Sequence, residues 1–273
     1  MKIIADSGST KTDWSILDDN GKETMRIRTQ GLNPFHLSTA EIREIITNEL
    51  IPNLPTESLS SLSFFGTGCT PEQIQPMTRL LEEVLKCDDV IVGSDLLGAA
   101  QALCHNREGI ACILGTGANS CLFDGRRIVS NTPPLGYILG DEGSGAVLGK
   151  LFLNAMFKGF LNKEIKELYL AETHQSYPDI IRRVYREPLA NRYLASISKF
   201  ISKHKDAYPE LCELVIYNFR EFIHKNIDIY KRKDLPLNFV GSIAWYYRKE
   251  LMSATEECGY HLGVVIKSPL DRI

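Results

Sequence analysis

Two short loops rich in glycine and threonine hold matching positions in the two halves of this sequence. The first loop, Asp6–Thr10, follows the apolar run Lys2–Ala5, and the second loop, Gly115–Asn119, follows Ile110–Leu114. Each run is typical of a buried strand and each loop leads into a further strand, so both loops are predicted to join the strands of a hairpin. Because this pattern starts twice, it predicts a duplicated architecture.

The remaining strand and helix signals extend both halves in the same way. In the first half, strands are predicted at 2–5, 14–17, 24–29, 62–65 and 90–92, with helices from 38 or 39, over 71–85 and from 95. In the second half, strands are predicted at 110–114, 120–123, 127–129, 237–240 and 262–266, with a helix over 243–255. These patterns predict an α/β fold of two lobes, 1–106 and 107–273, each with a central mixed sheet, and a helical insertion at about 145–230 in the second lobe.

Composition excludes several classes of partner. The formal net charge of −3 offers no basic excess for a nucleic acid backbone, so nucleic acid is not an expected partner. No apolar run is long enough to span a bilayer, so no membrane partner is expected either. The seven cysteines include no CxxC pair, which indicates thiols in a reducing compartment and predicts a cytoplasmic location.

The first loop contains residue types that suit a bound polyphosphate. Small residues such as Gly8 let backbone N–H groups approach an anion closely. Hydroxyl donors and a positive charge come from Ser9, Thr10, Lys11 and Thr12. Asp6, at the strand end, is a hard oxygen ligand that can hold Mg²⁺ through water. An ordinary polar hairpin with a strand-end aspartate remains the alternative.

The second loop is a second candidate for phosphate binding. Gly115–Ser120 comes close to the glycine fingerprint of Rossmann folds, but that fingerprint needs a helix after the glycines, and Cys121–Gly125 reads as a strand and a turn. No Walker A sequence occurs in the chain. Two glycine- and threonine-rich hairpins, one in each half, therefore suggest a phosphate group held from two sides.

Three further segments carry candidate chemistry at strand or helix ends. Asp95 follows a strand and begins a helix, where a carboxylate can accept a proton from a hydroxyl nucleophile; a plain helix cap is the alternative. Asp141 and Glu142 lie between glycines and suit sugar hydroxyls; the acidic start of a helix is the alternative. Gly241–Ser242 joins a strand to a helix and can place a flat base against the backbone; a simple turn is the alternative.

The two loops and these three further segments make five candidate segments. Taken in this order, the five resemble the actin/hexokinase/Hsp70 ATPase superfamily, whose lobes are ribonuclease H-like. More closely, they resemble the N-acetylglucosamine kinases and the related BadF/BadG activator ATPases. The resemblance covers nearly the whole chain, and the order of the segments is more specific than any one of them. It implies a two-lobed actin/hexokinase-like fold, Mg-ATP bound between the lobes with its phosphates on the two hairpins, and a small-molecule sugar as substrate.

The resemblance also implies roles for individual residues. The positions that match ATP contacts are Asp6, Gly8, Ser9, Thr10, Lys11, Thr116, Gly117, Gly241 and Ser242, with Ser196 and Tyr246 beside the base. The positions that match sugar contacts are Asn33, Asp95, Ala118, Asn119, Pro134, Leu135, Gly136 and Asp141. Asp95 matches the general base that deprotonates the sugar 6-hydroxyl for attack on the γ-phosphate of ATP, and Asp6 would hold Mg²⁺ through water.

Several alternatives stay open at this point. Pro134–Leu135 departs from the tryptophan-containing pattern of animal members, so N-acetylglucosamine, glucosamine, N-acetylmuramic acid and glucose all remain candidate acceptors. An activator ATPase would work through an iron–sulfur cluster, although Cys104 and Cys112 lack the spacing of a cluster motif. A non-catalytic nucleotide or sugar sensor would lose the base, and the presence of Asp6, Asp95 and Asp141 argues against it. A homodimer is a possible assembly.

Overall fold

The computed structural model describes residues 1–8, 10–55 and 58–271. Contacts divide the chain into two compact units: Met1–Ala102 with the C-terminal residues from Pro269 onward, and Leu103–Ser268. The sequence predicts a lobe boundary near residue 106, with the C-terminal residues in the second lobe. The C-terminal residues return to the first unit because the short helix Pro269–Asp271 packs on β1 (Lys2–Ser7), and Asp271 forms a 3.5 Å ion pair with Arg26.

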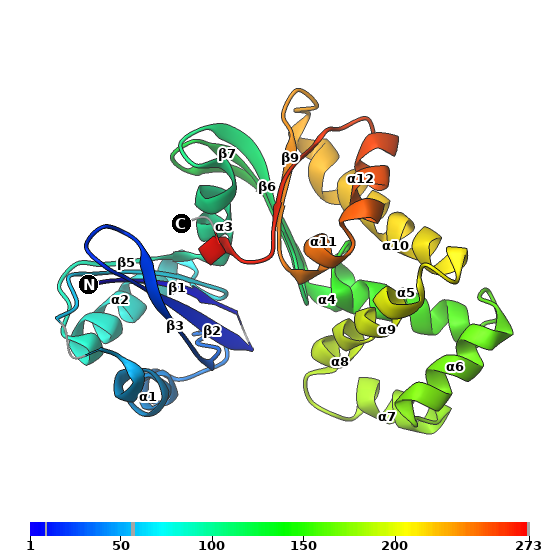
Figure 1. The fold of residues 1–273 in the computed structure, drawn as a ribbon, viewed down its shortest axis with the longest axis horizontal. Coiled ribbons are helices and arrows are strands. Elements are labelled where there is room, and N and C mark those ends of the chain that lie inside the picture. Colours follow the sequence, from blue (N-terminus) through cyan, green and yellow to red (C-terminus); the bar gives the residue numbers. More distant parts are fainter. Residues whose placement is uncertain (9, 56–57, 272–273) are drawn as a thin grey trace. The chain divides into compact units, whose positions relative to one another are not determined.

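The first unit is built on a five-stranded mixed sheet in the order β3-β2-β1-β4-β5 (Figure 1). Besides β1, its strands are β2 (Lys11–Leu17), β3 (Glu23–Gln30), β4 (Ser61–Gly66) and β5 (Val90–Ser94). The first three strands pair antiparallel, whereas β4 and β5 run parallel to β1. Its helices are α1 (Thr39–Ile45), continued by a π-helical turn at Ile46–Leu50, α2 (Pro71–Leu85) and α3 (Asp95–Cys104).

The second unit repeats this sheet, in the order β10-β9-β6-β7-β8. Its strands are β6 (Glu108–Leu114), β7 (Ala118–Asp124), β8 (Ile128–Thr132), β9 (Leu237–Val240) and β10 (Leu262–Ile266). Here too the first three strands pair antiparallel, and the last two run parallel to the first. Each strand therefore has a counterpart in the other unit, which confirms the predicted duplication with a mixed sheet in each half.

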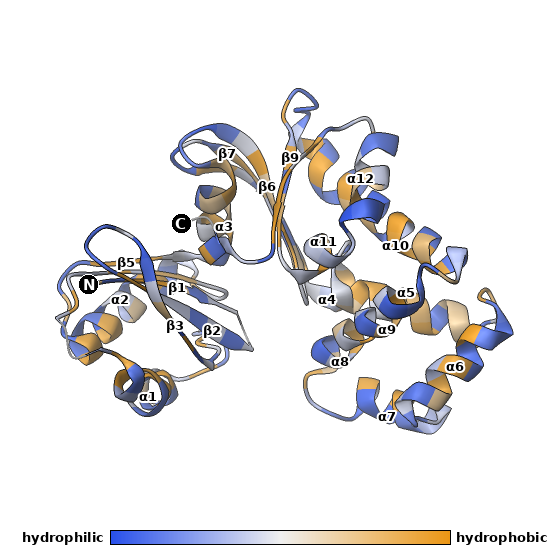
Figure 2. Ribbon diagram, viewed as in Figure 1, coloured by the Kyte–Doolittle hydropathy of each residue, from blue (hydrophilic) through white to orange (hydrophobic). Residues whose placement is uncertain are grey.

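Helices occupy most of the chain between β8 and β9. They are α4 (Gly136–Leu139), α5 (Gly145–Phe157), α6 (Lys163–Thr173), α7 (Tyr177–Tyr185), α8 (Ala190–Ser196), α9 (Ser198–His204) and α10 (Pro209–Phe222), which a π-helical turn continues at Ile223–Ile227. Phe152, Tyr169 and Phe200 hold three of them together, with ring centroids 5.0–5.6 Å apart. Apolar colour also concentrates on β6 and β9, the central strands of this unit (Figure 2).

Hydrophobic burial explains why each unit is compact. The core of the first unit gathers around the buried Trp14 and Phe64, whose ring centroids are 5.9 Å apart. The second unit has its own core, which includes Phe219, Phe222 and Phe239. Each buried aromatic side chain contributes roughly 1.5–3 kcal/mol by leaving water. Each core thereby stabilises the sheet of its own unit.

Two sequence predictions differ from the observed elements. The single helix predicted over 243–255 is wrong: α11 (Ser242–Tyr246) and α12 (Arg248–Glu257) are separate, because Tyr247 leaves helical geometry, is buried, and donates its hydroxyl to the Ser198 carbonyl. The strand predicted at 127–129 is shifted, since β8 spans Ile128–Thr132. Within the described parts of the chain, no helix combines the length and apolar character that crossing a membrane requires.

Candidate active site

The first loop leaves β1 after Ser7 and returns into β2 at Lys11. The hairpin closes through a 2.9 Å hydrogen bond from the Gly8 N–H to the Lys11 carbonyl. A Cβ on Gly8 would make only ordinary contacts, at 3.7 Å or more, so the space beside this backbone is open. Thr10 is exposed, and Ser9 lies outside the described residues. The described part of the loop thus has the open backbone that phosphate binding requires.

Two buried hydroxyl groups fasten this hairpin to the segment after β3. Ser7 Oγ and Thr12 Oγ1 are 2.8 Å apart, and the Leu32 N–H donates to Ser7 Oγ at 3.0 Å. Thr12 Oγ1 also donates to the Gln30 carbonyl at 3.1 Å. The expectation that Thr12 offers a hydroxyl to phosphate is therefore wrong, because its hydroxyl is buried and bonded within the unit.

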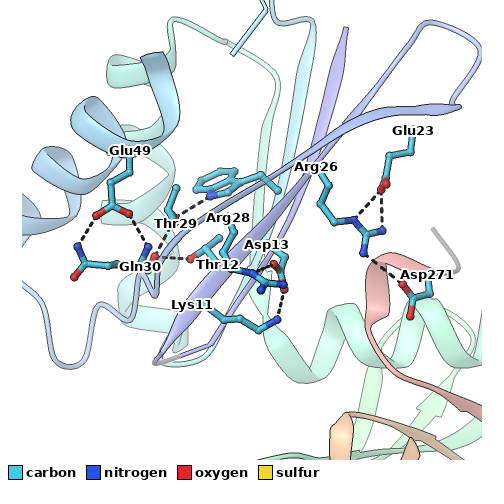
Figure 3. Close-up of polar contacts among 11 residues, drawn as sticks. Lys11, Thr12, Asp13, Glu23, Arg26, Arg28, Thr29, Gln30, Glu49 and Asp271 are labelled. Carbon is cyan, nitrogen blue, oxygen red and sulfur yellow. Dashed lines mark hydrogen bonds and ion pairs between the residues drawn. The ribbon is translucent and has the colours of Figure 1, made fainter. Parts of the chain in front are cut away.

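Lys11 is engaged by a buried carboxylate (Figure 3). Its ammonium group pairs with Asp13 Oδ2, while Arg28 Nε donates to Asp13 Oδ1 at 2.7 Å. Burial acts to raise the pKa of Asp13, but the hydrogen bonds from Lys11 and Arg28 outweigh it and hold that pKa below its ordinary value. The Lys11 side chain is still half exposed, so its charge stays accessible next to the loop.

Asp6 and Asp95 form a pair of interacting carboxylates at the ends of β1 and β5. Asp95 is the first residue of α3. Burial, followed by the nearby charge of Asp95, raises the pKa of Asp6 to about 7. Burial also raises the pKa of Asp95, and its hydrogen bonds oppose the rise. Carboxylates with raised pKa values at strand ends are candidates for acid–base work or cation binding.

Asp95 is held by a partner that the sequence analysis did not identify. Thr67 Oγ1 donates to Asp95 Oδ2 at 2.6 Å, and the Leu96 N–H donates to Oδ1 at 2.8 Å. The cap of α3 is instead Ser94, whose Oγ accepts from the Leu97 N–H at 3.2 Å. The alternative of a plain cap at Asp95 is therefore wrong. The only signal for Thr67 was its place between two glycines at a strand end.

Asn33 lies against the same strand end. Its side chain is buried, and its Oδ1 accepts from the Phe35 N–H at 2.9 Å. A Cβ on Gly68 would lie 2.0 Å from Asn33 Oδ1, so only glycine permits this approach, and Gly68 also has a φ of +83°. Gly68 packs against Asn33, and the residue before it, Thr67, bonds Asp95. Asn33 and Asp95 are therefore brought to neighbouring positions in the first unit.

In the second unit, the second loop lies against the N-terminus of α5. The loop closes through a 2.9 Å hydrogen bond from the Gly115 N–H to the Gly117 carbonyl. The N–H groups of Gly145 and Ala146 donate to the carbonyls of Gly115 and Thr116, at 2.8 and 3.2 Å. The first turn of α5 therefore satisfies and orients the carbonyls of the second loop.

Three segments predicted to bind the nucleotide meet at Gly145. A Cβ there would lie 3.1 Å from Ile243 Cδ1, 3.2 Å from Ala195 Cβ and 3.3 Å from the Gly115 carbonyl. Ser242 comes directly before Ile243, and Ser196 comes directly after Ala195. The two predicted residues, Ser242 and Ser196, therefore belong to segments that pack around Gly145. Ser196 is exposed, and its hydroxyl donates to the Tyr193 carbonyl at 2.6 Å.

Gly241 and Tyr246 belong to the same side of this unit. Gly241 has a φ of +122°, and a Cβ on it would lie 2.3 Å from the Leu114 carbonyl, so the turn after β9 requires glycine. Tyr246 is exposed, and the Lys267 ammonium donates to its hydroxyl at 2.9 Å and lies 5.1 Å from its ring centre. An exposed aromatic ring near this turn can stack on a base.

Within the second unit, predicted sugar contacts gather around Asp141. The Ala118 N–H donates to Asp141 Oδ1 at 3.3 Å, and the Asp141 N–H donates to the Pro134 carbonyl at 2.8 Å. A Cβ on Gly117 would lie 3.1 Å from Asp141 Oδ2. Burial raises the pKa of Asp141 to about 6, although the hydrogen bond from Ala118 opposes the rise. Near neutral pH, this side chain offers carboxylate oxygens to a ligand.

The other predicted sugar contacts flank this carboxylate. Asn119 Oδ1 accepts from the Ser120 N–H and from Asn131 Nδ2, both at 2.9 Å, which fixes the orientation of its amide. Leu135 and Gly136 both have positive φ, at +63° and +72°, and Leu135 is exposed. An exposed apolar side chain next to hydrogen-bonding groups suits an acylated sugar.

Comparison with known proteins gives this chain close structural relatives. It is 47% identical to a candidate N-acetylglucosamine kinase from Porphyromonas gingivalis of known structure, covering 99% of this chain and 96% of that chain with a TM-score of 0.96. A curated N-acetylmuramic acid/N-acetylglucosamine kinase from Clostridium acetobutylicum is 22% identical over 218 residues, which span 74% of this chain and 70% of that protein. No family model matches the sequence.

A more distant structure shows the fold alone. The ROK family glucokinase from Streptomyces griseus, solved with glucose and AMPPNP, is 13% identical and has a TM-score of 0.60 over 98% of this chain and 93% of that chain. This likeness confirms the predicted hexokinase-like duplicated fold. It assigns no residue of this chain to a ligand.

Proposed function

This chain belongs to the N-acetylglucosamine kinase family of actin-like ATPases, and on that premise we propose that it transfers the γ-phosphate of ATP to the 6-hydroxyl of N-acetylglucosamine or a related amino sugar. The observation that carries the proposal is the carboxylate of Asp95, half-buried at the end of β5, hydrogen-bonded to Thr67 and close enough to Asp6 to perturb its pKa. A sugar hydroxyl needs a positioned carboxylate of this kind to lose its proton.

Asp95 acts as the general base in this mechanism. The hydrogen bonds from Thr67 and Leu96 orient its carboxylate. Its raised pKa makes it a better proton acceptor than an ordinary surface aspartate. Asn33, beside Gly68, contributes to binding the sugar on the same unit. Proper orientation of the hydroxyl and the base provides much of the rate enhancement.

The two loops bind the phosphates of ATP. Open backbone at Gly8, with Thr10 and the charge of Lys11 nearby, supports the first loop in this role. Thr116 and Gly117 serve in the second loop, which α5 orients. Gly241, Ser242, Tyr246 and Ser196 contact the adenosine, in keeping with the convergence of their segments near Gly145.

The residues present fit a hydrated Mg²⁺ ion at Asp6. Asp6 and Asp95 are hard oxygen donors, and burial followed by the like charge of Asp95 raises the pKa of Asp6, so a cation would favour its ionised form. Within the described ranges, no three or more His, Cys, Asp or Glu side chains gather as a metal site, so water and phosphate oxygens would supply the other ligands. When bound, the ion neutralises charge on the transferring phosphate.

Asp141 and its neighbours bind the rest of the sugar. The Asp141 carboxylate accepts from sugar hydroxyls, with help from Ala118 and Asn119. The exposed Leu135, between Pro134 and Gly136, packs against the acyl group of the amino sugar. Carboxylates that bind hydroxyl pairs give a site its preference for one sugar over another.

A coupled assay of ADP release across a panel of sugars tests the proposed function. The panel contains N-acetylglucosamine, glucosamine, N-acetylmuramic acid and glucose. We expect ADP release to depend strongly on one of the amino sugars, and Asp95→Asn to nearly abolish it. Asp88→Asn, at an exposed position, is the matched control and should leave the rate unchanged. Equal turnover with and without sugar would contradict the proposal.

Location and assembly are proposals of their own. All seven cysteines are free and six are buried, which supports a reducing, cytoplasmic location. The homodimer stays a prediction, and light scattering of the purified protein tests it.

An activator ATPase would need an iron–sulfur cluster, so a colourless, iron-free preparation speaks against that alternative.

A further inference from the structure

The turn Gly140–Ser144 joins the sugar side of the second unit to its phosphate side. Near its start, Asp141 receives the hydrogen bond from Ala118. At its end, Ser144 caps α5 through its Oγ, which accepts from the Val147 N–H at 3.1 Å, and the first N–H groups of α5 bind the second loop. A shift of this turn would therefore move the sugar-binding carboxylate and the phosphate loop together.

The side chain of Asn218, on α10, holds this turn from inside the protein. Asn218 is fully buried. Its Oδ1 accepts from the Gly143 N–H at 3.0 Å, and its Nδ2 donates to the Ser144 carbonyl at 3.2 Å. The turn thus presents one donor and one acceptor, and a side-chain amide is the group that matches both.

Other residues on the same helix face hold the turn as well. A Cβ on Gly143, which has a φ of +80°, would lie 2.8 Å from Phe222 Cβ, so α10 packs directly on this glycine. Farther along, Lys225 and Asn226 contact the Glu142 carboxylate at 3.4 and 3.5 Å. Successive residues of the turn are therefore held by a continuous face of α10 and the π-helical turn after it.

We propose that Asn218 is a positioning residue of the kinase, whose amide fixes the Gly140–Ser144 turn and so aligns Asp141 and the second loop for their shared reaction. Asn218 contacts neither substrate, and it acts through the backbone of Gly143 and Ser144. This assignment rests on the proposed function. A positioning role explains why the fully buried polar side chain of Asn218 occurs in α10, a helix that contains none of the five candidate segments.

The test compares Asn218→Asp and Asn218→Ser with the same substitutions at Asn238. Asn238 is also a buried asparagine that bonds the backbone, through the carbonyls of Ile110 and Pro236 and the N–H of Val264. It lies near the start of β9, away from the second loop that follows the end of β6. Thermal unfolding and steady-state kinetics with varied sugar and varied ATP are measured for all four variants and the wild type.

We expect the Asn218 variants to fold, to lower kcat and to raise the KM for sugar, each by about tenfold, because a buried hydrogen bond to the turn is lost. The Asn238 variants should lose similar thermal stability and keep wild-type kcat and KM. Kinetic losses that match the loss of stability at both positions would overturn the proposal. So would wild-type kinetics at position 218, or a failure to fold confined to the Asn218 variants. If the wild-type protein itself lacks sugar-dependent ADP release, the proposed function fails instead.

Discussion

Thr67 donates a 2.6 Å hydrogen bond to Asp95, and this bond joins the end of β4 to the first residue of α3. The two residues are far apart in the sequence, and parallel pairing of β4 and β5 brings them together. The hydrogen bond leaves Asp95 with one orientation. For a base that must face a hydroxyl group, orientation matters as much as the pKa does.

Replacing Thr67 should therefore lower the rate without unfolding the protein. Thr67→Val keeps the shape and removes the hydroxyl, and a hydrogen bond to a charged group contributes about 1.5–3 kcal/mol, so kcat should fall about tenfold to a hundredfold. Thr67→Ser keeps the hydroxyl and should retain most of the activity. Steady-state kinetics of both variants check this, and equal losses in the two would show that the hydroxyl is not the cause.

The affinity for sugar should weaken in mild acid because of Asp141. Its pKa is raised to about 6, so it is mostly ionised at pH 7 and becomes protonated as the pH falls below 6. A protonated Asp141 loses acceptor capacity, and the KM for sugar should rise about tenfold for each pH unit below that point. Asp141→Asn should show a high KM with a flat pH dependence over the same range. A wild-type KM that stays constant from pH 7 to pH 5 would contradict the prediction.

Stability should depend on pH through Asp6, in the direction opposite to that of a salt-bridged aspartate. Its pKa is about 7 in the folded protein against an ordinary value of 3.8, so the fold favours the protonated form. The resulting stability is fully present below the unfolded-state pKa and is lost as the pH rises through 7. At pH 8, without nucleotide or Mg²⁺, Asp6→Asn should raise the free energy of unfolding by roughly 1–4 kcal/mol, and at pH 4 the two proteins should be alike.

Denaturant unfolding at several pH values measures the effect of Asp6→Asn. Asp88→Asn, at an exposed position, serves as the control and should follow the wild-type curve. The same pH dependence in the wild type and in Asp6→Asn would show that Asp6 is not the source.

Gly115 and Gly241, which follow the ends of β6 and β9, should respond differently to replacement by alanine. A Cβ on Gly115 would meet nothing within 4 Å, so Gly115→Ala should cost less than about 1 kcal/mol of stability and yet raise the KM for ATP, because the methyl group enters space meant for phosphate. Gly241→Ala places a Cβ 2.3 Å from the Leu114 carbonyl at a φ of +122° and should destabilise the fold by about 2 kcal/mol or more. Thermal unfolding and ATP kinetics separate the two outcomes. An unchanged KM for ATP in Gly115→Ala would argue against the second loop as a phosphate site.

Local signals predicted the elements of this fold well where they were complete within a few residues. Helix α2 spans Pro71–Leu85 as its periodic apolar residues and its first-turn proline predict. Helix α1 begins after Ser38, within the predicted start at 38 or 39, and Ser38 and Glu41 cap each other there. The break at Tyr247 was missed, because it depends on a hydroxyl that reaches the remote Ser198 carbonyl. No pattern near Tyr247 reports that partner.

The sequence by itself determined the order of the strands along the chain, the glycine-rich loops and the carboxylates at strand ends, because periodicity, turn chemistry and charge are properties of neighbouring residues. Only the tertiary structure decided that the Thr12 hydroxyl is turned inward, that Thr67 holds Asp95, and that Asn218 holds the turn beside Asp141. A hydroxyl or an amide can bond to any donor or acceptor within about 3 Å. Which partner lies at that distance is set by how the strands and helices of one unit pack, and not by the residues next to it in the chain.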